Sequence, residues 1–296
     1  MAGSLTRFIK QGDRHFLMRW TLLKQPAILP GFGLTLGFTV VYLCLIILIP
    51  LSTVVVQASG LNGSHFLEAA FSHRALAAYS LSLRTSLLAA LFNGLAGLLV
   101  AWVLVRYPFP GKRIIDGLID LPFALPTAVA GIVLTTLYAP QGWIGRHFES
   151  LGIKVAYSEL GIFVALTFIG LPFVVRTVMP VLENLDPEVQ EASSSLGAGY
   201  GQTLRRVIFP EIRPALLTGM VLAFARGLGE YGSVIFIAGN LPMKTEITPL
   251  LIMIKLEEYD YAGASAIALV FLVISFCLIL IVNLLEWDKK SLPVLE

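Results

Sequence analysis

The chain has 296 residues, of which 56% are hydrophobic and only 14% charged, and its mean hydropathy is +0.81. This composition excludes an ordinary soluble domain and predicts several membrane-spanning helices. The net charge of +2 is small, and no basic tract is interleaved with aromatic residues, so the chain is not expected to bind nucleic acid.

Residues 1–28 form a basic N-terminal tail in which Lys and Arg alternate with bulky apolar residues. Two interpretations stay open for it: an amphipathic helix on the inner membrane surface, in contact with membrane lipids, or a disordered basic tail. Residues 29–57 carry no charge. They are long enough for a first transmembrane helix, because about 20 helical residues cross a hydrocarbon core of ~30 Å.

A transmembrane domain is predicted over residues 78–285, followed by a C-terminal tail, 286–296. Its helices are expected in five apolar stretches, at about 80–105, 114–138, 160–180, 214–238 and 261–285. With the first helix this makes an all-α, polytopic membrane bundle of six transmembrane helices. Two prolines, Pro122 and Pro126, predict a bend early in the stretch 114–138, which either opens a central cavity or is purely structural.

The distribution of Lys and Arg predicts the topology. Basic residues concentrate in the N-terminal tail, in the loops after the second and fourth spans, and in the C-terminal tail. The other loops carry fewer basic residues and more acidic ones. The positive-inside rule therefore places both termini, and the loop from Asp186 to Pro214, in the cytoplasm.

No motif in the sequence predicts catalysis. Gly227–Gly232 fits a dinucleotide-binding pattern, but no strand precedes it and it lies within an apolar span. No Walker A motif and no nucleophile–base arrangement occurs, so the chain is not expected to be an enzyme or to bind a cofactor. The histidines have no metal-ligand spacing, and Cys44 and Cys277 lie within spans as packing residues, so no metal site is expected.

The polar interruption from Asp186 to Pro214 is the most informative stretch. Asp186 before Pro187 predicts a helix start, and Gly197 predicts its end, because glycine tolerates a left-handed backbone. A tight turn, a second short helix and Pro210 are expected to follow. Such a short helix is not stable alone, so it needs a surface to dock against.

The spacing of this stretch resembles the EAA loop of ABC importer permeases. The positions that carry the resemblance are Glu191, Ala192, Ser193, Gly197, Val207, Phe209 and Pro210. Three of them depart from the family pattern by small or apolar replacements: Ser193, Val207 and Phe209. In that family the loop, here 186–212, inserts into a groove on a cytoplasmic ATPase, so the resemblance assigns these residues to ATPase coupling. The alternative is an ordinary amphipathic loop.

Several further stretches resemble the T subunits of bacterial sulfate permeases, within the sulfate, thiosulfate and molybdate group. They are Leu121–Gly131, Pro172–Val178, Gly229–Asn240, Lys244–Glu246 and Ala264–Ala268. The resemblance implies a type I ABC importer transmembrane domain in a bacterial inner membrane, moving sulfate by alternating access. Its implied partners are a second permease subunit (a heterodimer), two ATPase subunits that use ATP and Mg²⁺, and a periplasmic sulfate-binding protein.

Three alternatives concern the cargo and the class of protein. The cargo could be thiosulfate, or molybdate or tungstate, since the group transports several oxyanions. A self-sufficient secondary anion transporter is a second class, and an intramembrane enzyme is a third, which the missing nucleophile–base pair disfavours.

Arg226, Gly229 and Glu230 are the candidate residues of the translocation path. Counted from the start of the fifth span, Arg226 lies about 16 Å into the membrane, and Glu230 follows one helical turn later. Charges at that depth either line a polar path or form a buried structural ion pair, and both interpretations stay open. Arg84 and Arg176 lie near span ends and are expected to anchor the helices at the interface.

Overall fold

The computed structural model describes residues 32–290, and in that range every regular element is a helix. The chain divides into two units, residues 1–53 and 54–296, which are described separately. The predicted basic tail, 1–28, lies outside the described residues, as do residues 291–296 of the predicted C-terminal tail.

The first apolar helix is built from α2 (Phe32–Leu43), the π-helical turn η2 (Cys44–Leu48) and α3 (Ile49–Ser59). The widened turn lies just before Pro50, a residue that cannot donate a backbone hydrogen bond. Gly33–Ser59 is long and apolar enough to cross a membrane, and none of its most apolar window is buried inside the chain. A helix of this composition requires apolar surroundings.

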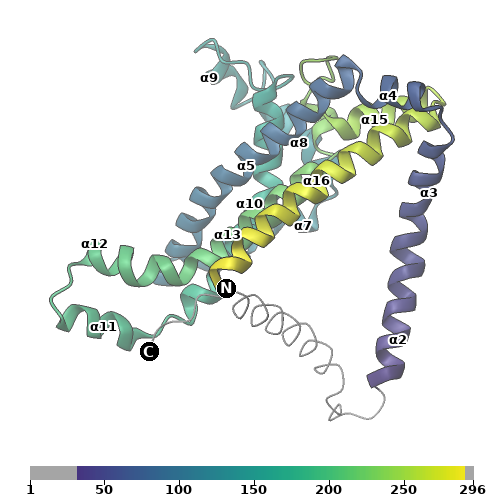
Figure 1. Cartoon of the computed structure of the whole chain (residues 1–296). Coiled ribbons are helices and arrows are strands. Elements are labelled where there is room, and N and C mark those ends of the chain that lie inside the picture. The colour runs from purple at the N-terminus through teal and green to yellow at the C-terminus, as the bar shows by residue number, and fades with distance from the viewer. Residues whose placement is uncertain (1–31, 291–296) are drawn as a thin grey trace, which may run out of the picture. The chain divides into compact units, whose positions relative to one another are not determined.

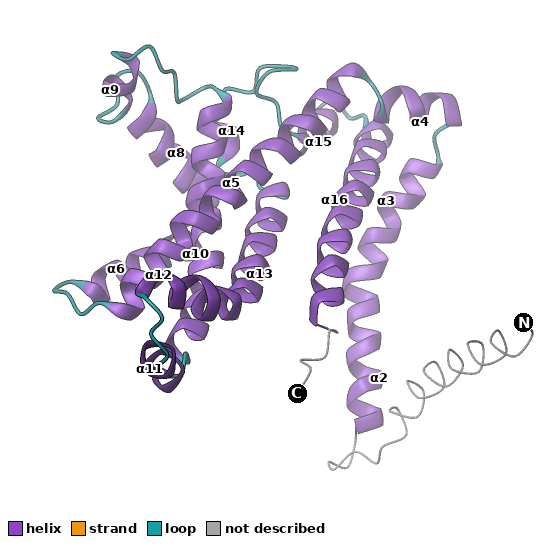
Figure 2. Ribbon diagram, turned by 60° about the vertical axis from the view of Figure 1, so that its left-hand side comes forward, coloured by secondary structure: helices purple, strands orange, loops and turns teal. Residues whose placement is uncertain are grey.

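Four long helices form the frame of the second unit: α5 (His73–Arg106), α10 (Glu159–Glu183), α13 (Phe209–Leu228) and α16 (Tyr261–Lys290). Figures 1 and 2 show α5, α10 and α13 running side by side, and α10 packs against both of the others. Glycines permit the close approach. A Cβ added to Gly97 would lie 2.8 Å from Val174, and one added to Gly219 would lie 2.9 Å from the Cα of Val174.

Shorter helices cover the two ends of this frame. They are α4 (Gly63–Ala70), α6 (Lys112–Ile119), α7 (Leu121–Ala124), α8 (Thr127–Tyr138), α9 (Gly145–Glu149), α11 (Pro187–Ser195), α12 (Tyr200–Thr203) with the π-helical turn η3 (Leu204–Ile208), α14 (Val234–Ile237) and α15 (Thr248–Glu257). Within the second unit, α11 and α12 lie at one end and α4 and α15 at the other (Figures 1 and 2). We call these the α11 end and the α15 end.

The predicted count of six continuous membrane helices is not confirmed. Among the described residues, five helices are long and apolar enough to cross a membrane. The stretch predicted as one span, 114–138, is instead divided into α6, α7 and α8. Leu125 is extended because it precedes Pro126, whose ring disfavours a helical conformation in the residue before it. The two prolines thus break this segment, where only a bend was expected.

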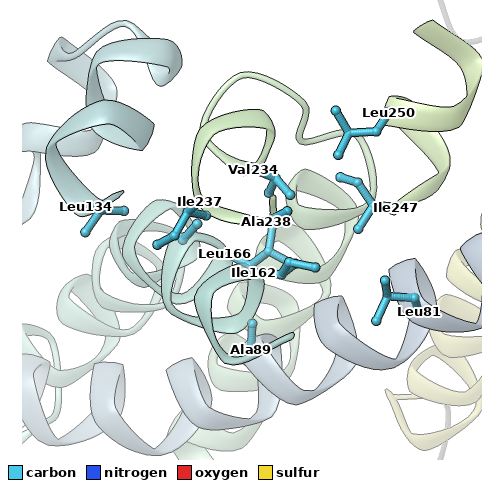
Figure 3. Close-up of a cluster of buried hydrophobic side chains, with 11 residues drawn as sticks. Leu81, Ala89, Leu134, Ile162, Leu166, Val234, Ile237, Ala238, Ile247 and Leu250 are labelled. Atoms are coloured by element: carbon cyan, nitrogen blue, oxygen red, sulfur yellow. The ribbon is translucent and has the colours of Figure 1, made fainter. Parts of the chain in front are cut away.

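A cluster of buried apolar side chains surrounds α14 (Figure 3). Val234 and Ile237 of this short helix are fully buried between α8 and α10. The cluster also takes Leu134 from α8, Ile162 from α10 and Leu81 from α5. α14 can enter the bundle because the chain breaks between α13 and α14, and that break is where two of the predicted site residues lie.

Candidate functional site

The structure places a short, capped helix at the predicted loop. α11 begins at Pro187, and the Asp186 carboxylate Oδ1 accepts a hydrogen bond from the backbone N–H of Glu188 at 2.9 Å. Gly197 has φ of +79°, and the N–H of the following Ala198 bonds the Ser193 carbonyl. Both predicted boundaries are confirmed, since an aspartate cap starts the helix and a left-handed glycine ends it.

Most side chains of α11 face away from the rest of the chain. Glu191 and Ala192 are exposed, and Leu196 at the end of the helix is 89% exposed. Ser193 faces the other way: its hydroxyl lies 2.9 Å from the hydroxyl of the buried Thr203 on α12. The helix is therefore tied to the chain on one face and open on the other, as expected of a segment that docks onto a second protein.

The second half of the loop differs from the prediction. No separate second short helix forms, because residues Tyr200–Leu228 make one apolar helix that contains the π-helical turn η3. In that turn the N–H of Phe209 bonds the carbonyl of Leu204, five residues earlier. Pro210 follows at once, and the widened turn accommodates its missing N–H. Forces applied at α12 would therefore be transmitted directly into α13.

The last three motif positions take different environments around this turn. Val207 is half-buried, whereas Phe209 and Pro210 are exposed. Val207 contributes to a cavity of about 470 Å³ between the end of α10, α11 and the start of α13. Its lining is Pro180, Val181, Asn184, Leu185, Asp186, Val189, Val207 and Glu211. Ile208, between the motif positions, is buried in the core and anchors the turn.

The charged residues of the path prediction lie where α13 ends. The helix stops at Leu228, so Glu230 is not within a continuous span 214–238 as predicted. Its side chain folds back to Arg226, with the guanidinium Nη1 2.5 Å from the carboxylate Oε2. The other oxygen, Oε1, accepts from both the backbone N–H and the hydroxyl of Ser233, each at 2.9 Å.

Glu230 and Arg226 therefore differ in accessibility. Glu230 is 1% exposed and both its oxygens are bonded, which favours a structural role for this carboxylate. The Arg226 side chain is 34% exposed, and an added Cβ at the exposed Gly229 would meet no atom within 4 Å. Glu230 thus holds the guanidinium in place, and Arg226 and Gly229 face open space beside the chain.

Close packing explains the other glycines near this break. A Cβ on Gly131 of α8 would lie 2.5 Å from the carbonyl oxygen of Ser233. A Cβ on Gly232 would lie even closer to the hydroxyl of Thr127, at the start of α8. These contacts hold α8 against the break, so Gly232 serves helix packing, whereas Gly229 has no such contact.

Arg176 does more than the interfacial anchoring predicted for it. Its Nε and Nη2 donate to the two carboxylate oxygens of Asp120 at 2.8 and 2.7 Å. Its Nη1 donates to Asp116 on α6 at 2.7 Å. This forked ion pair fixes α6 and the start of α7 onto α10. Arg84, by contrast, pairs with Glu159 at the surface, where both side chains are about half exposed.

Two further charge clusters at the α15 end were not singled out from the sequence. Arg74 forks onto Glu246 with distances of 2.7 and 2.6 Å, and Glu246 is 1% exposed. On α15, a hydrogen bond to Glu258 raises the pKa of Lys255, partial burial opposes the shift, and Asp260 adds to it. Within residues 32–290, no group of three or more His, Cys, Asp or Glu side chains is placed to hold a metal ion.

Residues 93–290 match the protein family described as the inner membrane component of binding-protein-dependent transport systems. Two thirds of the chain lie in this match, including α10, α11, α13 and the break after it.

Curated relatives are similar over most of their length. The sulfate transport system permease protein CysT of Salmonella typhimurium is 49% identical over 259 residues, which cover 88% of this chain and 94% of the relative. The protein of the same name from Synechocystis is 50% identical over 85% of this chain and 88% of its own. A probable sulfate transport system permease protein from Chlorokybus atmophyticus is also 50% identical, over 84% of this chain and 87% of its own.

Solved structures share the fold. A chain from a bacterial ABC transporter involved in import of the acidic polysaccharide alginate superimposes with a TM-score of 0.71. The match covers 95% of this chain and 99% of that one at 16% sequence identity. A chain of an amino acid ABC transporter gives a TM-score of 0.56 over 77% of this chain and 99% of its own, at 19% identity.

Proposed function

This chain belongs to the family of binding-protein-dependent transport system inner membrane components, and from that premise we propose that it is the sulfate-translocating permease subunit of an ATP-driven importer. The observation that carries the sulfate assignment is the identity of 49–50% to sulfate transport system permeases over most of the chain. The family match over residues 93–290 includes both the helix break and the loop that bears α11.

The α11 helix is the proposed coupling element. Its exposed face around Glu191, Ala192 and Leu196 would insert into a groove of a cytoplasmic ATPase. Ser193 and Gly197 fix the orientation of that face, and the turn at Val207, Phe209 and Pro210 passes its movement into α13. The exposure of the helix and its continuity with a long apolar helix support this role.

We expect further subunits to hydrolyse ATP, to complete the translocation path and to deliver the anion. ATP and Mg²⁺ would be used by two ATPase subunits, and the permease itself would not hydrolyse ATP. A second, homologous permease subunit would complete the path as a heterodimer, because Arg226 and Gly229 face open space beside a single chain. A periplasmic sulfate-binding protein would deliver the anion to the α15 end.

The orientation is a proposal that rests on the charge distribution. Arg205, Arg206 and Arg213 lie near the α11 end, which would be cytoplasmic under the positive-inside rule. Both termini would then be cytoplasmic in a bacterial-type inner membrane.

Sulfate carries two charges and is strongly hydrated, so it needs a polar cavity that opens to one side at a time. Arg226 is the proposed contact for the anion, and Glu230 holds its guanidinium at the break while partly offsetting its charge. Partial neutralisation suits a path, since the ion must leave the site as well as reach it.

Uptake of labelled sulfate by proteoliposomes tests the proposal. The complete complex, with both permeases, the ATPase and the loaded binding protein, should import sulfate only with ATP inside the compartment that the α11 end faces. Omission of the ATPase or the nucleotide should abolish uptake. Uptake by this chain alone would instead indicate a secondary anion transporter, and stronger competition by molybdate or tungstate than by sulfate would overturn the cargo.

A further inference from the structure

The buried face of α5 carries four polar side chains: Ser82, Thr85, Ser86 and Asn93. Those nearest the α15 end have partners. The Ser82 hydroxyl donates to the Thr248 hydroxyl at 3.0 Å and accepts from the Thr248 N–H at 2.8 Å. Thr85 donates to the carbonyl of Leu81, one turn back on its own helix, at 2.7 Å. The polar groups of Ser82 and Thr85 are thus satisfied, whereas the buried hydroxyl of Ser86, the next residue, has no partner among the described residues.

Asn93 also lacks partners. It is 0% exposed, and within the part of the chain that the structure describes neither its Oδ1 nor its Nδ2 has a hydrogen-bond partner. An amide can form up to four hydrogen bonds, and leaving all of them unmade in a buried helix interface lowers stability. A leucine of similar shape would carry no such penalty. An amide at this position would therefore favour a second arrangement of the helices in which it is paired.

The partner for that arrangement lies on α10. A Cβ added to Gly170 would lie 2.5 Å from the Asn93 Nδ2, so the amide sits directly against this helix. One turn earlier, the Thr167 hydroxyl is also buried without a partner among the described residues.

The two helices approach closely at glycines. The Val174 side chain packs against Gly97 and the Asn93 amide against Gly170, so a shift along the axis changes which group of α10 meets the amide. The Thr167 hydroxyl is three residues from Gly170 on the same face of α10, which corresponds to about 4.5 Å along the axis at 1.5 Å per residue.

We propose that Asn93 is a positioning residue of the transport cycle, whose amide bonds the Thr167 hydroxyl of α10 in the opposite access state and is released in the state described here. This inference rests on the proposed function, because it requires a transporter with two states. A bond that forms in one state only shifts the equilibrium towards that state by its own free energy. Asn93 would thereby set the balance between the two states without touching the cargo.

Three variants of the full complex in nanodiscs test the proposal. Asn93→Leu should leave the melting temperature unchanged or raise it, because an unpaired buried amide is removed, while ATP-driven uptake falls at least tenfold. Thr167→Val removes the partner hydroxyl at constant shape. It should likewise leave the melting temperature unchanged or raise it, and lower ATP-driven uptake. Ser82→Ala is the matched control: it removes a bonded hydroxyl, so it should lower the melting temperature and leave uptake per folded complex within twofold.

A stable Asn93→Leu complex with normal uptake would overturn the proposal, as would one that melts at a lower temperature or does not assemble. A cargo-free measurement separates this inference from the sulfate assignment. Spin labels at the exposed positions Leu95 on α5 and Leu160 on α10 report the distance between the helices. Trapping with ATP and vanadate should change that distance in the native complex and not in Asn93→Leu. An equal change in both would contradict the role of Asn93, whatever anion is carried.

Discussion

The α11 loop and the charged break after α13 were both singled out by sequence, yet they are built in opposite ways. In the loop, the motif side chains Glu191 and Ala192 point away from the chain, and a leucine beside them is almost fully exposed. In the break, Glu230 is buried and every oxygen of its carboxylate is bonded within the chain. The side chains proposed to act on a partner are exposed, whereas the carboxylate that holds the break is bonded within the chain.

The largest effect is expected from Gly197→Val. A β-branched residue at φ of +79° is strained, so the exit of α11 would change direction and its exposed face would no longer fit the ATPase. ATP-driven uptake should fall to background while the subunit still inserts into membranes. Gly199→Ala is the control, since Gly199 has φ of −71° and open space around it. Normal uptake in Gly197→Val would contradict the coupling role of the loop.

Glu230→Ala should be the most destabilising change in the break. It leaves the buried Ser233 groups without their acceptor, which costs about 1–3 kcal/mol, and it leaves the partly exposed Arg226 guanidinium without its partner. Thermal unfolding of the detergent-solubilised complex measures the loss. Glu230→Gln, which can still accept from Ser233, should lose less. An equal melting temperature for Glu230→Ala and the native protein would show that the pair does not hold the break.

Arg226→Ala should reduce uptake at least tenfold, and Arg84→Ala by less than twofold. The Arg84–Glu159 pair is about half exposed, and such pairs contribute only about 0–1 kcal/mol. Initial rates of sulfate uptake, normalised to assembled complex, give the comparison.

A double variant separates anion contact from structural support in the same measurement. Arg226→Met with Glu230→Gln removes both charges, so stability lost in either single variant should largely return. Uptake should stay low if Arg226 contacts the anion. Recovery of uptake together with stability would assign the pair to structure alone.

The smallest effect is expected at Ser193, where the loop meets α12. Ser193→Ala removes one hydroxyl–hydroxyl contact to Thr203, with a net cost of about 0.5–1.5 kcal/mol, and keeps the side chain small. Uptake should fall by no more than about threefold. Ser193→Leu should have a clearly larger effect, because a bulky side chain would push α11 away from α12. Indistinguishable uptake in the two variants would show that the spacing between these helices is unimportant.

Local sequence rules succeeded wherever the determining contacts are short in range. Asp186 and Gly197 set the ends of α11 through bonds to residues at most five positions away, so their types alone predict the helix. Pro122 and Pro126 predicted a disturbance of the third span, but the number of pieces depended on packing. Packing also decided the start of α13: the expected second short helix is continuous with α13 through a π-helical turn.

Contacts between residues far apart in the chain could not be inferred in this way. Arg176 bonds Asp120, which is 56 positions away in the sequence, and Arg74 bonds Glu246, which is 172 positions away. Asn93 shows no sequence signal at all, because an asparagine in an apolar helix has the same local pattern whether or not it is paired. Only its burial against Gly170 distinguishes it.

The amino-acid sequence by itself determined that this protein is an all-helical membrane protein, which helix protrudes from it, and which transport family it belongs to. Hydrophobic length, helix caps and motif spacing are local properties, so they can be read along the chain. The tertiary structure alone decided that α13 stops at Leu228, that Glu230 folds back onto Arg226, and that the amide of Asn93 is enclosed with no partner among residues 32–290. Those features depend on how closely the helices pack, and packing is settled by side chains that meet only after the chain has folded.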